Sequence, residues 1–368
     1  MKKFRYGNVL RLGTLQFDGH VHDYFVKNSK KLVVYYILPR GGEIKNFIAV
    51  YKNGKLFVKK NVYSPKNIVA AYLNYYFQYL KILFKYFSKS EKIYFLNTLP
   101  VFFFFNSILR QLRNLEIIYW VQDFWPMNVP SIKFFRWFMY YYHKRLKYTI
   151  YVSDRINKVM NSGKLLNQEN KHTVMLGINP PKIEKRKLKN SITLCFIGVI
   201  VESQGVDLLL STVAKNKNLN LRIIGTGREE LVQKYKKLIT TLELENRVYF
   251  PNKFIYGNEL SKEIKNCHAG IVLYEENKNT VTYFADPAKI KQYAEFGLPV
   301  IMTRVSEIAD YIERFKAGII VQRNEKSVSK AISEMMESYP DYLEGIKRFN
   351  KYFDYKSYYA KAFRFLEK

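Results

Sequence analysis

The sequence of 368 residues contains only two cysteines, Cys195 and Cys267, and they lie far apart. Two separated cysteines suggest neither a disulfide framework nor a zinc site, and they fit a reducing cytosol. The first residues lack an apolar segment of signal-peptide length. No uninterrupted apolar run approaches the roughly 20 residues that a membrane-spanning helix needs. We therefore expect a cytoplasmic protein that does not span a membrane.

Acidic residues are also scarce, above all in the first half of the chain. The net charge is +30, from 61 Lys and Arg against 31 Asp and Glu. Residues 1–190 hold 34 basic and 9 acidic residues, a net of +25, whereas the remainder hold 27 and 22, a net of +5. Such an uneven charge predicts an anionic partner for the first half: an acidic lipid surface, a lipid pyrophosphate or nucleic acid.

Large aromatic residues are interleaved with basic ones in two segments, 72–86 and 133–145. Each segment predicts a helix with an aromatic face and cationic edges, a combination that suits the headgroup layer of an anionic membrane. Lys81, Lys85, Lys133 and Arg136 would then contact the lipid. The alternative is that the aromatic residues form core and the lysines a solvated face. We favour peripheral binding to the inner face of the cell membrane.

The order of the expected elements predicts an α/β protein of two domains. Residues 31–39, 92–96, 116–121 and 148–152 are predicted strands, whereas residues 66–88 and 102–113 are predicted helices. Asn53-Gly54 lies between two short apolar runs and predicts a hairpin. Ser153 is placed to start a helix. An N-terminal domain over residues 1–178, a proline- and lysine-rich linker over 179–191 and a C-terminal domain over 192–349 are expected.

A series of short patches follows in the second half, and the first two glycine patches come after apolar runs of strand length and before helical patterns. The patches are Phe196-Ile-Gly198, Gln204-Gly205-Val-Asp207, Ile224-Gly225-Thr-Gly227-Arg228, Arg247-Val-Tyr-Phe250, Pro287-Ala-Lys289 and Gly297-Leu-Pro-Val-Ile301. Glycine turns between a strand and a helix aim backbone N–H groups at a phosphate. The series therefore predicts a site for a nucleotide diphosphate.

Residues 192–321 resemble the donor domain of the glycosyltransferase-B (GT-B) fold, in retaining glycosyltransferase family 4. The resemblance implies two Rossmann-like, doubly wound domains facing a cleft, with a last helix at 350–368 that crosses back to the N-terminal domain. It implies transfer of a sugar from a UDP- or GDP-sugar to a saccharide or a polyprenyl-diphosphate-linked acceptor, with retention and with no required cofactor. The family's phosphate-binding arginine and lysine fall on Val199 and Gln204, and its ribose-binding glutamate falls on Gln292.

Lys289 is the strongest candidate for a donor-binding side chain. A cation at a helix N-terminus is unfavourable unless an anion lies beside it, and the diphosphate would be that anion. The other expected donor-binding residues are Gly198, Gln204, Gly205, Gly225, Gly227, Arg228, Phe254, Tyr256, Tyr283, Asp286, Gln292 and Tyr293. Of these, Tyr283, Asp286, Gln292 and Tyr293 are expected to line the sugar or ribose pocket, and Phe254 or Tyr256 to contact the base.

The acceptor side is predicted from two polar segments of the first half. Gln122-Asp123-Phe-Trp125-Pro resembles a sequence motif found in sugar transferases that act on lipid-linked saccharides. Asp123 could orient the sugar or take a proton. The second segment supplies His20, His22 and Asp23, with His22 as a candidate general base. We expect no metal, because the other histidines lack carboxylate-rich surroundings.

Two other functions remain open at this point. An inverting GT-B transferase, or a sugar-nucleotide epimerase of the same fold, would use Asp123 or His22 as an acid or base. A nucleic-acid-binding protein with an inert transferase-like core would explain the charge and the departures from the family pattern. We expect no nucleic acid partner.

Overall fold

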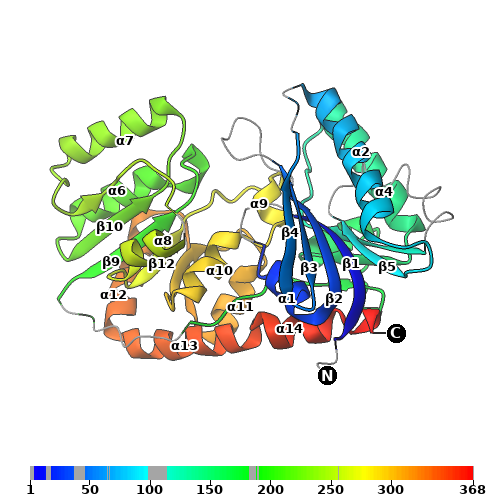
Figure 1. Ribbon diagram of the computed structural model, residues 1–368. Helices are drawn as coiled ribbons and strands as arrows, with labels where there is room; N and C mark the ends of the chain where they lie inside the picture. The colour runs from blue at the N-terminus through cyan, green and yellow to red at the C-terminus, as the bar shows by residue number, and fades with distance from the viewer. Residues whose placement is uncertain are drawn as a thin grey trace. The chain divides into compact units, whose positions relative to one another are not determined.

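The computed structural model describes residues 4–13, 18–36, 46–63, 65, 67–97, 114–181, 188, 190–255 and 257–367. The chain divides into two compact units. Unit 1 comprises residues 1–177 together with 355–368, and unit 2 comprises residues 178–354. Each unit is built on its own sheet (Figure 1).

Unit 1 contains an eight-stranded mixed sheet in the order β4-β3-β2-β1-β5-β6-β7-β8. Its strands β1, β2, β5, β6, β7 and β8 pair in parallel, and β3 and β4 add an antiparallel hairpin at one edge. The strands are β1 (Tyr6–Gly13), β2 (Ser29–Tyr36), β3 (Phe47–Lys52), β4 (Lys55–Asn61), β5 (Ile93–Asn97), β6 (Leu115–Val121), β7 (Tyr148–Tyr151) and β8 (Lys171–Thr173).

Local sequence signals account for several elements of unit 1. Asn53 and Gly54 both have positive φ, 53° and 80°, as a two-residue hairpin turn requires, and the predicted hairpin is confirmed. Ser153 caps a helix, because its hydroxyl oxygen accepts the N–H of Ile156 at 3.2 Å. The predicted helix at 102–113 lies outside the described residues. The described helices of the first part of this unit are α1 (Val21–Asn28), α2 (Ile68–Tyr86), α4 (Pro130–Arg145) and α5 (Asp154–Met160).

The last residues of the chain return to unit 1 through α14 (Tyr355–Ala362) and the short helix η3 (Arg364–Leu366). The hydroxyl of Tyr359 accepts the N–H of Gly177 at 2.7 Å and donates to the carbonyl of Gly19 at 2.8 Å. The ring of Phe363 lies 5.1 Å from that of Phe25, centroid to centroid. Buried aromatic contacts and a satisfied hydroxyl thus hold the final helix on the first unit, as the GT-B resemblance predicted.

Unit 2 contains a six-stranded, entirely parallel sheet in the order β11-β10-β9-β12-β13-β14. Strands and helices alternate along the chain, which is the doubly wound arrangement. The strands are β9 (Ile192–Ile197), β10 (Leu219–Ile224), β11 (Val248–Tyr249), β12 (Ala269–Val272), β13 (Val300–Thr303) and β14 (Gly318–Val321). The helices are η2 (Glu202–Gln204), α6 (Val206–Lys215), α7 (Glu229–Thr241), α8 (Gly257–Ile264), α9 (Val281–Phe284), α10 (Ala288–Glu295), α11 (Ile308–Phe315), α12 (Glu325–Glu337) and α13 (Tyr339–Tyr352).

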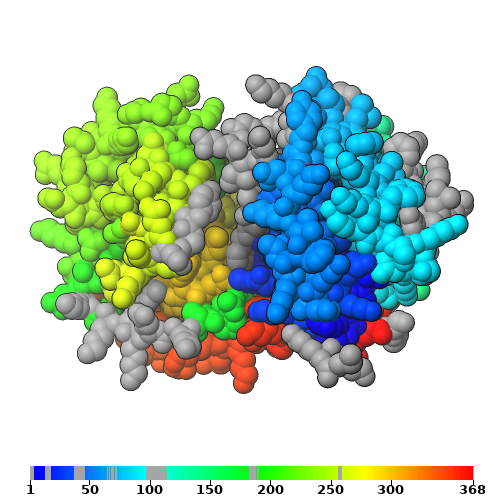
Figure 2. All heavy atoms as spheres, viewed as in Figure 1, coloured from blue at the N-terminus to red at the C-terminus, as the bar shows by residue number. Residues whose placement is uncertain are grey.

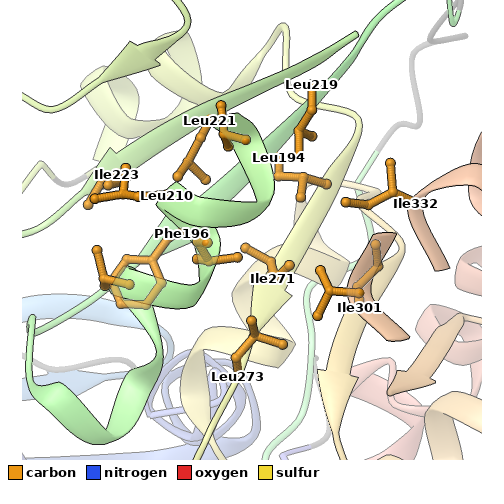
Figure 3. Packing of buried hydrophobic residues seen from close by; sticks show 14 of the residues in the cluster. Leu194, Phe196, Leu210, Leu219, Leu221, Ile223, Ile271, Leu273, Ile301 and Ile332 are labelled. Carbon is orange, nitrogen blue, oxygen red and sulfur yellow. The ribbon is translucent and has the colours of Figure 1, made fainter. Parts of the chain in front are cut away.

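The core of unit 2 forms where apolar strands meet the apolar faces of its helices. Leu194, Phe196 and Ile271 from the central strands are fully or almost fully buried and lie close to Leu210 of α6 (Figure 3). The strands read as nearly continuous apolar runs, because helices cover both faces of a parallel sheet. Ile332 of α12 belongs to the same cluster. Both cysteines are buried and unbridged.

The ends of β9 and β10 approach each other without intervening side chains. Gly198 donates its N–H to the carbonyl of Ile224 at 3.0 Å. A Cβ added at Gly225 would lie 1.8 Å from the carbonyl oxygen of Gly198, and one added at Gly227 would lie 2.4 Å from that of Ile200. Only glycine permits this backbone contact, so Gly225 and Gly227 shape the turn after β10.

Within the part of the chain that the structure describes, no helix is both long and apolar enough to cross a bilayer.

We predict that Gly225→Ala destabilises the protein by about 3 kcal/mol, because the new methyl group would have to displace a backbone carbonyl. Gly7→Ala in β1 is the control, since a Cβ there meets nothing within 4 Å. Chemical denaturation of both variants measures the difference. Equal stability of the two variants would show that the β9–β10 junction relaxes freely.

Candidate functional site

The first element of the site is the turn that follows β9. Gly198 has a φ of 131°, and a Cβ added there would lie 3.2 Å from Nζ of Lys289. Lys289 is the second residue of α10, after Pro287 at the N-cap. Its Nζ donates a 2.6 Å hydrogen bond to Oε1 of Gln204. The structure thus brings together three predicted donor-binding residues, although they lie up to 91 positions apart in the sequence, at 198 and 289.

The ammonium group of Lys289 lies among aromatic rings rather than carboxylates. It is 4.7 Å from the ring centroid of Phe196 and 5.2 Å from that of Tyr274. Burial lowers the pKa of Lys289 to about 7, because desolvation disfavours the charged form. Within the described ranges it forms no ion pair, and its hydrogen bond goes to a neutral amide. An incoming anion would therefore stabilise the charged form.

Gln204 and Gly205 form a turn that a second cation holds in place. Gly205 has a φ of 71° and is the N-cap of α6. Arg323, which follows β14, donates from Nη2 to the carbonyl of Glu202 at 3.2 Å and from Nε to that of Leu273 at 3.3 Å. A Cβ at Gly205 would lie 3.5 Å from this Nε. Arg323 therefore positions the turn that holds the partner of Lys289.

We call Gly198, Gln204, Gly205, Lys289 and Arg323 the Lys289 cluster. It contains a glycine turn, the N-terminal ends of α6 and α10 and two cationic side chains. Unpaired backbone N–H groups at helix N-termini and cations together favour phosphate oxygens. The chemistry of this cluster fits a diphosphate, which can accept hydrogen bonds and neutralise both charges.

Two residues that the sequence suggested as pocket lining are instead buried. The hydroxyl of Tyr293 accepts the N–H of Ile197 at 2.8 Å, and its ring lies where a Cβ of Gly270 would be, 2.3 Å from Cγ. Asp286 has a fully buried carboxylate, whose Oδ2 lies 3.6 Å from Nζ of Lys291. These expectations are corrected: Tyr293 is a core residue, and Asp286 faces a buried lysine.

The remaining predicted donor residues lie at or near the surface. Gln292 is half-buried on α10, and Tyr283 is half-buried on α9. Arg228 is exposed at the N-cap of α7, and the side chain of Phe254 is also exposed. Tyr256 lies outside the described residues.

Lys291 is a buried cation that the sequence reasoning missed. Its Nζ lies 3.1 Å from the ring centroid of Phe353, in addition to its contact with Asp286. Burial lowers the pKa of Lys291 to about 8, and the Asp286 carboxylate opposes that shift. Phe353 also accepts the N–H of Ile178 through its carbonyl at 2.8 Å. Lys291 thus ties α10 to the two chain segments at the boundary of unit 2.

In unit 1, Asp123 follows the carboxyl end of β6 in a loop that Arg136 fixes. Arg136 of α4 donates to the carbonyls of Trp125 and Pro126, at 3.0 and 2.6 Å. Asp123 is exposed, while partial desolvation by surrounding protein atoms raises its pKa. Gln122 and Trp125 are half-buried. The guanidinium of Arg136 holds this loop, and its contact with lipid stays a prediction.

The second polar segment of unit 1 is organised by a buried ion pair. Nη2 of Arg11 lies 2.6 Å from Oδ2 of Asp18, which also accepts the N–H of His22 at 3.2 Å. Nδ1 of His22 is 3.1 Å from the hydroxyl of Tyr36. Burial and then the Arg11 charge lower the pKa of His22, so its imidazole is neutral at pH 7.

His20 and Asp23 pair with each other at the start of α1. His20 has a left-handed φ of 62°, and its Nδ1 lies 2.9 Å from Oδ2 of Asp23. This hydrogen bond lowers the pKa of Asp23. In the described portion of the chain, no group of three or more His, Cys, Asp or Glu side chains is arranged to hold a metal ion.

Comparison with known families agrees with this geometry. The sequence model of the family described as "Glycosyl transferases group 1" matches residues 180–352, almost all of unit 2. Unit 2 is a glycosyl transferases group 1 domain. The chain is thus a glycosyltransferase, and assignment to family 4 is consistent with this match. No curated protein sequence matches the chain.

Solved structures establish the GT-B fold over nearly the whole glycosyltransferase chain. Sucrose-phosphate synthase from Thermosynechococcus elongatus is similar with a TM-score of 0.67 at 11% identity, over 97% of this chain and 98% of that one. HepE from Anabaena, in complex with UDP-glucose, gives 0.66 at 13%, over 98% and 99%. WaaG, a glycosyltransferase involved in lipopolysaccharide biosynthesis, gives 0.58 at 13%, over 98% of each chain.

We predict that the glycosyltransferase becomes more stable as the pH rises from 8 towards 10, partly through Lys291. The unfolded chain binds a proton at Lys291 up to a pKa near 10.5, whereas the folded protein releases it near 8. Stability therefore increases across this window by roughly 1.4 kcal/mol per pH unit for this group.

The matched control is the neutral pair Asp286→Asn with Lys291→Met, which avoids leaving one buried charge alone. Chemical denaturation at several pH values should show a shallower slope for the double variant. An unchanged slope would mean that Lys291 is not buried as a depressed-pKa lysine.

Proposed function

We propose that this glycosyltransferase moves a sugar from a nucleoside-diphosphate sugar, UDP- or GDP-linked, to a hydroxyl of a saccharide or lipid-linked acceptor. The observation that carries the proposal is Lys289. Its ammonium lies beside the bare Gly198 turn, with no carboxylate partner in the described residues and with a pKa lowered to about 7. A diphosphate at this position would supply the missing negative charge.

The Lys289 cluster suits stabilisation of a departing diphosphate. As the bond between the anomeric carbon and the diphosphate breaks, negative charge grows on the phosphate oxygens. A fixed ammonium and backbone N–H groups aimed at these oxygens lower the barrier without reorganising. The family resemblance favours attack on the same face, with the leaving diphosphate taking the acceptor's proton. Such a retaining reaction needs no protein nucleophile and, in our proposal, no metal.

We place the acceptor on unit 1, near Asp123 and His22. Asp123 is exposed on a loop that Arg136 fixes, together with Gln122 and Trp125. His22 is held by Asp18 and Tyr36. Carboxylate, amide and imidazole groups held in fixed positions can orient sugar hydroxyls. His20 and Asp23 would contribute at the edge of this region.

Similar proteins support a UDP-sugar donor and a cell-envelope product. The Anabaena protein HepE has been solved with UDP-glucose, and WaaG is involved in lipopolysaccharide biosynthesis. By analogy we propose synthesis of a cell-surface polysaccharide or glycolipid at the cytoplasmic face of the membrane. The net charge of +25 in residues 1–190 fits a peripheral position on an anionic bilayer.

An inverting transfer or an epimerisation is the second candidate, and the raised pKa of Asp123 favours it. A carboxylate whose pKa is raised is a better proton acceptor for an attacking hydroxyl.

We predict that Lys289→Ala weakens UDP binding by roughly tenfold or more, the loss of one charge-assisted contact, while the fold stays intact. Isothermal titration with UDP measures this, and thermal unfolding checks the fold. Lys237→Ala, an exposed lysine of α7, is the control. Unchanged affinity of Lys289→Ala would remove Lys289 from the site.

The same site gives a prediction about pH. Above a pKa of about 7 the free lysine is mostly neutral, so UDP must bind together with a proton and its affinity falls between pH 7 and 9. Lys289→Arg should bind UDP with little pH dependence over this range, because the guanidinium stays charged. A wild-type affinity that is constant from pH 7 to 9 would contradict the proposal.

We predict that slow hydrolysis of UDP-glucose without an acceptor releases α-glucose first, as same-face attack by water requires. NMR of the anomeric proton during early turnover measures this outcome. Asp123→Asn should leave UDP affinity unchanged, since Asp123 lies on unit 1. Early release of β-glucose, together with loss of turnover in Asp123→Asn, would instead support inversion with Asp123 as base.

A further inference from the structure

A groove of about 190 Å³ lies between the end of β4 and the helix α2 in unit 1. Its floor includes the buried side chains of Ile48, Val62 and Ile82. A hydrogen bond of 2.7 Å from the side chain of Asn74 to the carbonyl of Tyr63 ties the helix to the chain beyond the strand. The groove is therefore built by two fixed elements.

Three lysines, Lys60, Lys81 and Lys85, line this groove, and no carboxylate lines it. All three are exposed. Two of them lie near aromatic rings: Nζ of Lys81 is 6.0 Å from the ring centroid of Phe77, and Nζ of Lys85 is 5.6 Å from that of Tyr86. Within the described ranges none of the three forms an ion pair. Three ammonium groups around one concave site make it complementary to a phosphate group.

Exposed apolar side chains surround the groove. On α2, Leu73, Phe77 and Phe84 are 57% to 65% exposed and follow one face of the helix together with Lys81. The opposite face is buried, because Tyr79 stacks on Phe95 of β5 at 4.9 Å. On the other face of the helix, Leu73 and Phe77 are therefore exposed rather than packed into the core.

The edge strand β4 adds to the same surface. Leu56 and Phe57 are 53% and 63% exposed, and Tyr63, just beyond the strand, is 74% exposed. Figure 2 shows part of this face, where the residues of β4 and α2 appear in blue to cyan. A long edge strand with exposed apolar residues usually carries a protective device or a partner. Here lysines on the strand keep it soluble while leaving it suited to a charged surface.

We propose that the β4–α2 groove seats the headgroup phosphate of an anionic phospholipid while Leu56, Leu73 and Phe77 enter the interfacial layer of the bilayer. Phosphates and apolar chains lie within one layer of a membrane, as the lysines and apolar side chains do on this surface. Leu56 and Leu73 provide no stacking face for bases, whereas aliphatic and aromatic side chains alike enter the interfacial layer, so the set as a whole favours a bilayer over nucleic acid. This inference rests on the proposed function in one respect: it identifies the membrane surface that the proposed transferase would bind.

The test uses the full chain and vesicles of phosphatidylcholine with phosphatidylglycerol, measured by co-sedimentation. The triple variant Lys60→Glu, Lys81→Glu, Lys85→Glu should partition roughly a hundredfold more weakly, since each lysine near an anionic surface contributes about a factor of five. The control replaces Lys158, Lys164 and Lys361, which are exposed lysines elsewhere in unit 1, with Glu. It carries the same net charge and should lose less than about threefold.

Equal losses in the two triple variants would show that net charge alone attracts the protein to vesicles. This result would overturn the proposal that the groove seats a headgroup phosphate. A second variant, Leu73→Gln with Phe77→Gln, should also weaken vesicle binding, and both positions are exposed enough to leave folding unaffected. Should it bind vesicles like the wild type, while single-stranded RNA binding is lost in the groove triple variant, the surface serves nucleic acid instead. UDP titration of every variant reports the donor site separately, so failure of the proposed activity is distinguishable from failure of the groove.

Discussion

A carbonyl oxygen occupies the space that a side chain would need at the junction of β9 and β10. The oxygen of Gly198 would lie 1.8 Å from a Cβ of Gly225, so the two strand ends meet as bare backbone. This contact fixes the path of the turn that leaves β9. Lys289 can then bring its ammonium close to Gly198, where an added Cβ would lie only 3.2 Å from Nζ. The positive site of unit 2 is thus created by missing side chains as much as by the lysine.

Two lysines on one short helix illustrate how position decides role. Lys289 and Lys291 are two residues apart, so they point to different sides of α10. Lys291 is buried against Asp286 and Phe353, whereas Lys289 has a neutral amide as its partner. Lys291 faces an opposite charge within the fold, whereas Lys289 faces no carboxylate among the described residues, which is why we propose Lys289 as the site of an external anion. Lys291 thus links α10 to Phe353, whereas Lys289 remains available to a ligand.

The sequence was most informative where a signal is local or repeated. The Asn53-Gly54 hairpin and the Ser153 cap depend on a few neighbouring residues, and both are present. The ordered patches carry the resemblance that predicted the GT-B fold. They also suggested Gly198, Gln204 and Lys289 as donor-binding residues, and these three lie in one cluster in the structure. By contrast, a family pattern gives the order of residues but not the side of a helix on which each lies. Tyr293 and Asp286 were therefore expected in a pocket and are found in the interior.

Residues that act through distant contacts gave no sequence signal. Arg323 holds the carbonyl of Glu202, more than a hundred positions earlier, and Arg11 pairs with Asp18, seven positions later. In a basic sequence, an arginine that holds a loop cannot be distinguished from one that is only solvated, because the difference lies in its tertiary contacts. To predict which basic residues pair with an acid and which stay exposed, one would have to know which acidic side chains lie near each of them in the fold.

The scarcity of acids in the first half explains how its charge is divided. Arg11 forms an ion pair with Asp18, and Lys31 forms one with Glu91. Arg136 donates hydrogen bonds to backbone carbonyls instead. With so few carboxylates, most remaining lysines have to stay at the surface, where they repel one another unless an outside anion is present. That repulsion is strongest where several lysines converge on a concave surface, as Lys60, Lys81 and Lys85 do. A fold that keeps them together beside exposed apolar side chains is less stable alone than against an anionic, partly apolar surface, and a bilayer combines both properties.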